Sequence, residues 1–238
     1  GFNLSYEDGT RSAWKSSPNV MAISSVYYIL NNTNLGDNWP IITSFILNLL
    51  EDHEVFFKAQ GCLLLRSFVG KNPSILTRGG LLELYLSAVK VCMSYLPNLT
   101  PEKESLYILN EAFPTAFDLL HHYSNPTEAF ILLLNENMFS TIQYVYDRSD
   151  KVVVLVLKYI HLMIHNYMKS DVFACLSRLF YTVNQLLTGP LLFDRKKEMA
   201  FEISTICLKI QADVFELVEK EGGSSLLRKY NYDFITVW

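Results

Sequence analysis

The sequence predicts an all-α fold, an α-solenoid built from HEAT-like antiparallel helical hairpins. Three observations lead to this prediction. Apolar residues recur at the helical period in about eleven segments of roughly 8 to 20 residues. Short loops rich in Gly, Pro and Asn join these segments, and a strand pattern is conceivable only over Phe234–Trp238. Sequential helices with local contacts suit stacked hairpins, in which each unit touches only its neighbours.

The clearest hairpin lies in Trp39–Val69. It contains two apolar helical runs, Ile41–Leu50 and Val55–Val69, and the acidic turn Glu51–Glu54 joins them. Two helices with so short a connection must fold back on one another as an antiparallel pair.

The second half of this hairpin has the residue spacing of a HEAT-type repeat. Asp52 is expected to cap the second helix by accepting its free amide donors. The dipeptide Phe57–Lys58 follows, and Phe57, Gly61, Leu64 and Leu65 fall on one stripe at the helical period. A mid-helix glycine costs ~1 kcal/mol against alanine, so Gly61 predicts close approach of a neighbouring backbone. An ordinary amphipathic hairpin of a helical bundle is the alternative for this stretch.

Start and stop signals place the other helices. Thr100–Pro101–Glu102 and Asn125–Pro126–Thr127–Glu128 both read as capped helix starts with proline in the first turn. Asp150 is expected to cap the helix that follows it, and Gly189–Pro190 to end another. Pro114 is expected to kink or split its helix. The predicted helices outside the opening hairpin are 20–31, a short one from 74, 81–96, 101–123, 129–134, 138–146, 151–166, 171–187, 193–211 and 214–220.

This pattern divides the chain into three parts. Residues 1–19 are polar and without a period, and we expect an extended N-terminal arm. Residues 20–221 form the HEAT-like helical repeat domain. Residues 222–238 begin with a glycine- and serine-rich break and form a C-terminal aromatic tail.

Composition excludes several classes of ligand. The net charge is −4, and a protein that neutralises nucleic-acid phosphates needs a basic face. The clusters Arg195–Lys197 and Arg228–Lys229 are interpreted as solvated helix turns. The longest candidate membrane segment, Val152–Ile164, is too short for a bilayer and carries Lys158 and His161. We therefore expect a soluble protein that binds neither nucleic acid nor membrane.

The four cysteines lie inside apolar helical runs and form no C-x-x-C pair. They predict buried, reduced thiols in the cytoplasm or nucleus, without a disulfide framework or zinc site. These residues are Cys62, Cys92, Cys175 and Cys207.

Two polar groups have some features of a metal or catalytic site but do not complete one. His161 and His165 lie four apart on one helix face, but the segment lacks the glutamate of a zinc protease, and no nearby acid offers a third ligand. Glu51–Glu54 concentrates carboxylates, but its residues are explained by a cap and an exposed turn. No phosphate-binding loop, dinucleotide fingerprint or nucleophile elbow occurs. The sequence thus predicts no enzyme, no catalytic residue, no metal and no cofactor.

Surface aromatic residues are the better functional candidates. Aromatic side chains dominate interface hot spots, and two clusters fall outside the predicted helices. The partner-binding candidates are Arg11, Trp14 and Lys15 in the arm and Tyr232, Phe234 and Trp238 in the tail. The alternative is that arm and tail fold back to cover the end repeats, which need capping.

Four motifs resemble the Tel-Two-interacting protein Two family. They are Arg11–Lys15 (RSAWK), Leu49–His53 (LLEDH), the proline-bracketed turn Tyr95–Ser105 (YLPNLTPEKES) and Ala112–Ala116 (AFPTA). The turn is the most specific of them, and the motifs together cover about residues 11 to 123.

The resemblance implies a non-catalytic scaffold subunit of the TTT complex, with Tel-Two and the first Tel-Two-interacting protein as HEAT-repeat partners, and a link to the ASTRA complex. Family members act with the Hsp-ninety machinery in the maturation, stability and assembly of phosphatidylinositol-3-kinase-related kinases, including the TOR and DNA-damage kinases. The resemblance also places the protein in cytoplasm and nucleus. The alternative is a helical-repeat scaffold of another pathway, in transport or phosphatase regulation.

Overall fold

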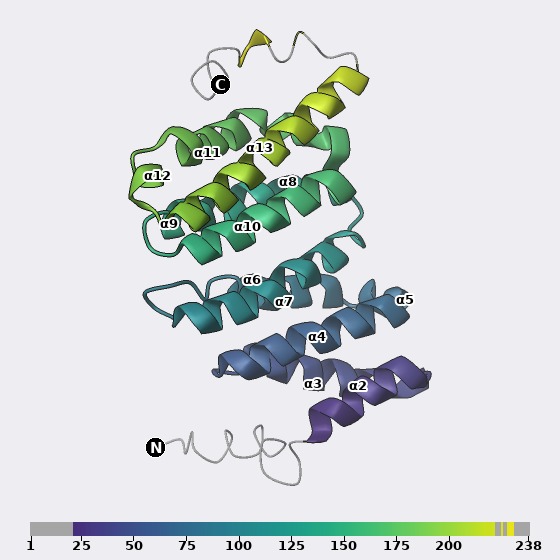
Figure 1. Cartoon of the computed structure of the whole chain (residues 1–238). Coiled ribbons are helices and arrows are strands. Elements are labelled where there is room, and N and C mark those ends of the chain that lie inside the picture. Colours follow the sequence, from purple (N-terminus) through teal and green to yellow (C-terminus); the bar gives the residue numbers. More distant parts are fainter. Residues whose placement is uncertain (1–20, 222–224, 226–227, 231–238) are drawn as a thin grey trace, which may run out of the picture. The chain divides into compact units, whose positions relative to one another are not determined.

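The computed structural model describes residues 21–221, 225 and 228–230. Across these residues every named element is a helix, and the one extended pairing is an isolated bridge between Pro97 and Thr100 (Figure 1). The prediction of an all-α fold built from packed helices is confirmed. The predicted arm, most of the tail and the possible strand at its end lie outside the described residues; of the tail, only residues 225 and 228–230 are described.

The chain forms two compact units. The first comprises residues 1–94 and 107–122, and the second comprises residues 95–106 and 123–238. Helix α7 (Glu102–Leu120) therefore contributes its first residues to the second unit and the remainder to the first.

The first unit contains the predicted hairpin and the helices packed on it. Besides the larger part of α7, its elements are α2 (Ala22–Asn32), the 3-10 turn Gly36–Asn38, α3 (Trp39–Glu51), α4 (Val55–Lys71), α5 (Pro73–Leu76) and α6 (Leu81–Cys92). The predicted hairpin consists of α3 and α4. Helices α3 and α4 pair as predicted, while α2 packs on α4 and α6 packs on both. Phe68 and Tyr85 are fully buried between these helices. The Tyr85 hydroxyl donates to the Thr43 carbonyl oxygen at 3.1 Å, so the largest buried polar group has an acceptor.

The turn between α3 and α4 is built by two charged side chains. Asp52 accepts a hydrogen bond from the Glu54 amide at 2.8 Å, so it closes the turn before α4 and does not cap the helix itself as predicted. Lys58 is only 3% exposed, and its ammonium donates to the Leu50 carbonyl oxygen at 2.6 Å. The last carbonyls of a helix lack intrahelical partners and attract cations, so Lys58 stabilises the end of α3 from within α4.

Gly61 lies where α4 crosses closest to α3. A β-carbon added there would stand 2.9 Å from the Leu50 amide nitrogen and 3.0 Å from the Leu49 β-carbon. The predicted close approach at this glycine is confirmed.

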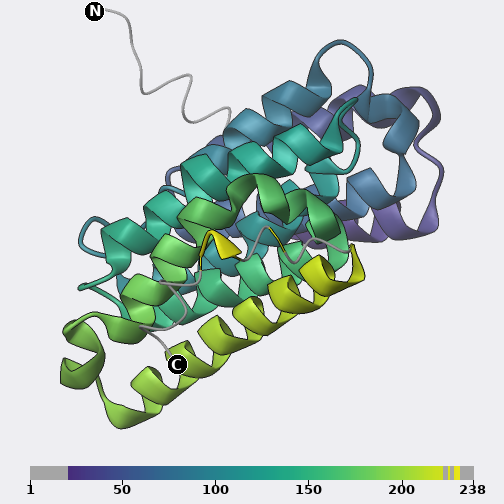
Figure 2. The same ribbon diagram turned by 90° about the horizontal axis from the view of Figure 1, so that it is seen from above.

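The second unit contains the remaining helices. They are α8 (Pro126–Leu132), a π-helical segment (Leu133–Met138), α9 (Phe139–Val145), α10 (Asp150–Met163), a second π-helical segment (Ile164–Met168), a 3-10 segment (Lys169–Cys175), α11 (Leu176–Thr188), α12 (Leu191–Asp194) and α13 (Lys197–Lys220). Helix α13 packs against α10 and α11, and α9 packs against the same two helices. Figure 2 shows α13 as the long yellow-green helix. Its apolar stripe, which includes Ile203, Cys207, Ile210 and Val214, is fully buried.

Three predicted boundaries differ from the structure. The helix from Leu81 ends at Cys92 and does not reach Leu96, and the proline at 97 disfavours helical geometry at Leu96 itself. Pro114 lies inside an unbroken α7, so the helix does not split there. The predicted helices 193–211 and 214–220 are one continuous α13 that begins at Lys197.

Two of the predicted helix caps in this unit, those at Asn125 and Asp150, had different outcomes. Asn125 accepts from the Glu128 amide at 3.3 Å and donates back to the Glu128 carboxylate at 3.1 Å, which confirms that cap. At α10 the cap is Ser149, whose hydroxyl accepts from the Val152 amide at 3.2 Å. Asp150 was predicted to cap this helix, but it is instead the first helical residue.

None of the helices in the described part of the chain has the length and apolar character needed to cross a membrane.

Candidate functional site

The partner-binding residues predicted from sequence all lie outside the described residues. These are Arg11, Trp14 and Lys15 in the arm and Tyr232, Phe234 and Trp238 in the tail. Their role stays a prediction, and the candidate sites considered next are built from the helices.

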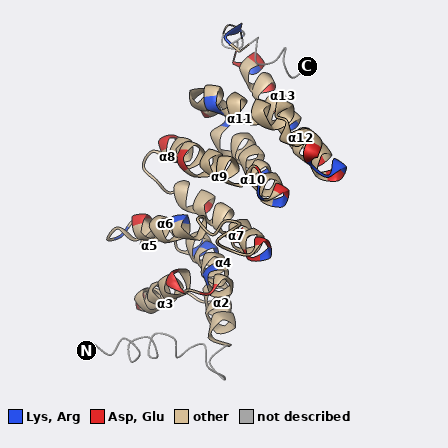
Figure 3. Cartoon of the chain, turned by 90° about the vertical axis from the view of Figure 1, so that its left-hand side faces the viewer, with Lys and Arg blue, Asp and Glu red and all other residues tan. Residues whose placement is uncertain are grey.

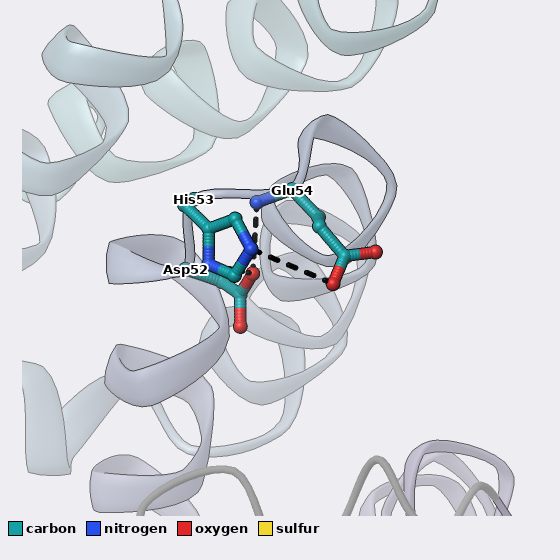
Figure 4. A group of neighbouring side chains, drawn as sticks. All are labelled: Asp52, His53 and Glu54. Atoms are coloured by element: carbon teal, nitrogen blue, oxygen red, sulfur yellow. Dashed lines mark hydrogen bonds and ion pairs between the residues drawn. The ribbon is translucent and has the colours of Figure 1, made fainter. Parts of the chain in front are cut away.

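The acidic turn Asp52–His53–Glu54 is the first polar cluster (Figure 4). His53 Nδ1 lies 3.6 Å from an Asp52 oxygen, and His53 Nε2 lies 3.8 Å from a Glu54 oxygen. The three ligand atoms are close enough to surround a cation. However, the His53 side chain is 84% exposed, and Asp52 already accepts the Glu54 amide. The turn geometry explains the carboxylates without a ligand.

A polar cleft of about 480 Å³ is a candidate site in the described part of the second unit. Three interhelical turns form it: the start of α7, the α9–α10 turn and the α12–α13 turn. The ribbon colours of Figure 3 mark acidic and basic residues at the ends of α10 and α12. The lining residues are Glu102, Tyr146, Asp147, Arg148, Ser149, Asp150, Lys151, Leu191, Asp194, Arg195, Lys196 and Met199.

Arg195 joins two of these turns. Its Nε donates to Asp150 Oδ1 at 2.6 Å, and its Nη2 donates to the Tyr146 carbonyl oxygen at 2.5 Å. The guanidinium also lies 5.0 Å from the centre of the Tyr146 ring, and its side chain is only 5% exposed. The prediction of a solvated turn at 195–197 is therefore wrong for Arg195. Its planar fork of donors suits a buried contact between two loops.

Glu102 joins the start of α7 to the α9–α10 turn. Its carboxylate accepts from the Ser149 hydroxyl at 2.7 Å and from the Lys151 ammonium at 3.1 Å. These hydrogen bonds, Ser149 first and Lys151 second, lower the pKa of Glu102. A general acid needs the opposite shift, toward the protonated form near neutral pH. The cleft therefore holds its perturbed carboxylate in the charged state, as a structural ion pair does.

The histidines declined as metal ligands have a neighbour that the sequence did not reveal. His161 Nε2 lies 2.9 Å from Asp213 Oδ2, and His165 Nδ1 lies 3.5 Å from the same oxygen. The expectation that no acid offers a third ligand is wrong. Asp213 comes from α13, nearly fifty residues further along the chain, and α13 packs directly on α10.

The four cysteines are buried as predicted. A hydrogen bond with Cys92 and burial raise the pKa of Cys62, and burial raises the pKa of Cys207 to about 12. Such thiols carry almost no reactive thiolate at neutral pH. These two are packing residues of the helical core.

A model of the Tti2 family matches residues 1–194. The chain belongs to the Tti2 family. This confirms the resemblance seen in the four motifs and extends it beyond residue 123. No curated protein and no solved structure matches the chain. Membership of the Tti2 family supports, in general terms, a role as a subunit of the TTT complex.

Sequence reasoning missed three residues that organise these sites: Arg195, Asp213 and Ser149. The sequence contains a weak signal only for Ser149, which is a good capping residue directly before Asp150. Arg195 and Asp213 become significant only when α12 and α13 are packed against the α9–α10 region.

Proposed function

We propose that this chain is a non-catalytic scaffold subunit of the TTT complex that binds Tel-Two and the first Tel-Two-interacting protein. Through that complex it supports the maturation, stability and assembly of phosphatidylinositol-3-kinase-related kinases together with the Hsp-ninety machinery. Membership of the Tti2 family over residues 1–194 carries this proposal. Family membership also favours this complex over a scaffold role in transport or phosphatase regulation, which the helical repeat pattern alone leaves open.

Features of the helices support a binding role. Phe193 on α12 is 85% exposed and Phe201 on α13 is 73% exposed, close in sequence to the cleft residues Asp194 and Met199. Aromatic residues are enriched at protein interfaces, so these two exposed rings are candidates for a surface that a partner covers. Hydrogen bonds hold the Glu102 carboxylate of the cleft in its charged form, which suits a structural role better than acid–base catalysis.

Co-expression with the first Tel-Two-interacting protein tests the proposal. Size-exclusion chromatography of the pair should give one co-eluting peak, because a stable interface with a HEAT-repeat protein should bury well above ~1,000 Å². An unrelated helical-repeat protein of similar size is the control partner. Two separate peaks at micromolar concentrations would contradict the proposal.

Point variants separate the arm from the helical domain. Trp14→Ala should weaken partner binding if the arm contacts the partner. Phe193→Ala should weaken it if the exposed surface of α12 does. Gly70→Ala is a matched control, since this exposed position of α4 has no neighbouring atom for a new β-carbon to meet. Full partner affinity in Trp14→Ala would remove the arm from the interface.

We place the protein in the cytoplasm and the nucleus, where its proposed client kinases mature. Imaging of a fluorescent fusion tests this, and exclusion from both compartments would contradict it.

A further inference from the structure

Two imidazoles and a carboxylate converge between α10 and α13. His161 lies in α10, and His165 lies one turn later in the π-helical continuation, so both rings project from the same face. Their ring centres are 6.3 Å apart. Asp213 on α13 directs one oxygen, Oδ2, toward a nitrogen of each ring, at 2.9 and 3.5 Å.

The hydrogen-bond geometry of this group is incomplete. Asp213 Oδ2 is buried from solvent but has no hydrogen-bond partner with acceptable geometry, although His161 Nε2 is only 2.9 Å away. The two atoms are close enough for a hydrogen bond, but the donor does not point at the acceptor. Hydrogen bonds weaken steeply when the donor is misaligned in this way. A buried carboxylate oxygen without an aligned donor is costly, and a cation between it and the ring nitrogens would satisfy all three atoms.

The donor set indicates which cation fits. Imidazole nitrogen with carboxylate oxygen suits Zn²⁺, which tolerates irregular four-coordinate geometry and binds both ligand types at about 2.0–2.2 Å. Hard cations such as Mg²⁺ prefer oxygen ligands alone. We propose that His161, His165 and Asp213 form a Zn²⁺ site that joins α10 to α13.

One side chain has to turn for this site to close, because the ligand atoms of His161, His165 and Asp213 do not all lie within 4.8 Å of one another. His165 is 69% exposed, so its ring can rotate toward the other two ligands without displacing core side chains. The side chains of His161 and Asp213 are more buried, and His161 Nε2 already lies 2.9 Å from Asp213 Oδ2. A small cavity of about 220 Å³, lined by His165, Asp213 and Glu216 among others, adjoins the group and leaves room for a water ligand.

Glu216 is the available fourth protein ligand. It follows Asp213 by three residues on the same face of α13, and its carboxylate is held by Lys220 at 2.6 Å. Exposed ion pairs of this kind contribute little to stability, so Zn²⁺ can displace Lys220 at low cost. The exposed turn Asp52–His53–Glu54 is the competing cation site, but it offers one imidazole and takes all its ligands from a single turn.

Calorimetric titration of the metal-free full chain with Zn²⁺ tests the site. We expect one Zn²⁺ per chain and a higher thermal unfolding temperature with Zn²⁺, because a ligand that binds only the folded state stabilises it. His165→Asn is the primary variant, since this exposed side chain is not needed for folding. It should weaken Zn²⁺ binding by about tenfold or more and remove the thermal shift. Asp213→Asn should do the same, with circular dichroism confirming that the helices are retained.

His53→Asn is the matched control, because it removes the imidazole of the competing turn. It should leave the Zn²⁺ affinity and stoichiometry unchanged. Three results would overturn the proposal: no binding at Zn²⁺ concentrations up to about 100 μM, unchanged affinity in His165→Asn, or loss of binding in His53→Asn alone. Since these measurements involve no partner protein, their failure is distinguishable from failure of the proposed scaffold function.

Discussion

Replacing Gly61 by alanine tests how closely α4 approaches α3. The new β-carbon would lie 2.9 Å from the Leu50 amide nitrogen, 3.0 Å from the Leu49 β-carbon and 3.1 Å from Leu50 Cδ2. The first contact is with backbone, so relief requires the two helices to separate. Overpacking of this kind costs about 1–3 kcal/mol.

Helix propensity acts in the opposite direction. Alanine is favoured over glycine by ~1 kcal/mol in a helix interior, so Gly61→Ala should destabilise by about 0–2 kcal/mol. Gly70 supplies the matched control within α4, because a β-carbon there meets no atom within 4 Å. Gly70→Ala should therefore stabilise by up to about 1 kcal/mol. Gly61→Leu gains the same propensity but adds three further carbons, so it should destabilise by about 2 kcal/mol or more.

Equilibrium unfolding in urea measures these differences. The informative quantity is the free energy of unfolding of Gly61→Ala relative to that of Gly70→Ala, which should be lower by about 1–3 kcal/mol. For a chain of this length, 1 kcal/mol corresponds to roughly 2–4 °C in Tm. If the two alanine variants were equally stable, the close approach of the hairpin helices would be refuted.

Three further predictions concern charged side chains that join neighbouring elements. Lys58→Met should destabilise by about 1–3 kcal/mol in urea unfolding, because it leaves a buried carbonyl at the end of α3 without its donor; stability equal to that of the wild type would contradict this. Arg195→Met should lower the free energy of unfolding by about 3 kcal/mol, because it leaves the Asp150 carboxylate and the Tyr146 carbonyl without their donor. Lys196→Met, at the exposed neighbouring position, should change it by no more than about 0.5 kcal/mol. Equal effects of the two variants would show that Arg195 does not hold the two turns together. The pKa of Glu102 is lowered in the folded state, so its small contribution to stability is present above its ordinary pKa of 4.5 and is lost as pH falls through the folded value. Ser149→Ala should raise that pKa toward 4.5 in an NMR titration, and an unchanged value would contradict the assigned cause.

The local features of the fold could be read from sequence because their signals are local. The helical spacing of apolar residues and a four-residue turn predict the α3–α4 hairpin. A glycine in a helix interior predicts close packing at Gly61. The cap at Asn125 uses atoms only three residues apart, so it depends little on the rest of the chain.

The polar sites could not be read in this way, because each joins residues far apart in sequence. Asp150 and Ser149 are both good capping residues, and the choice between them depends on Arg195, which pairs with Asp150 across the α12–α13 turn. Asp213 falls between the predicted helices 193–211 and 214–220. In the structure it lies within an unbroken α13 and faces the two histidines of the α10 region.

By itself, the sequence determined where helices form, which faces are apolar and to which family the chain belongs. Those properties depend on residue order over one or two helical turns. The tertiary structure alone decided which charged side chains are buried and paired, because burial and pairing require two helices to meet. Arg195 and Asp213 acquire their roles only through the packing of α12 and α13 on the α9–α10 region.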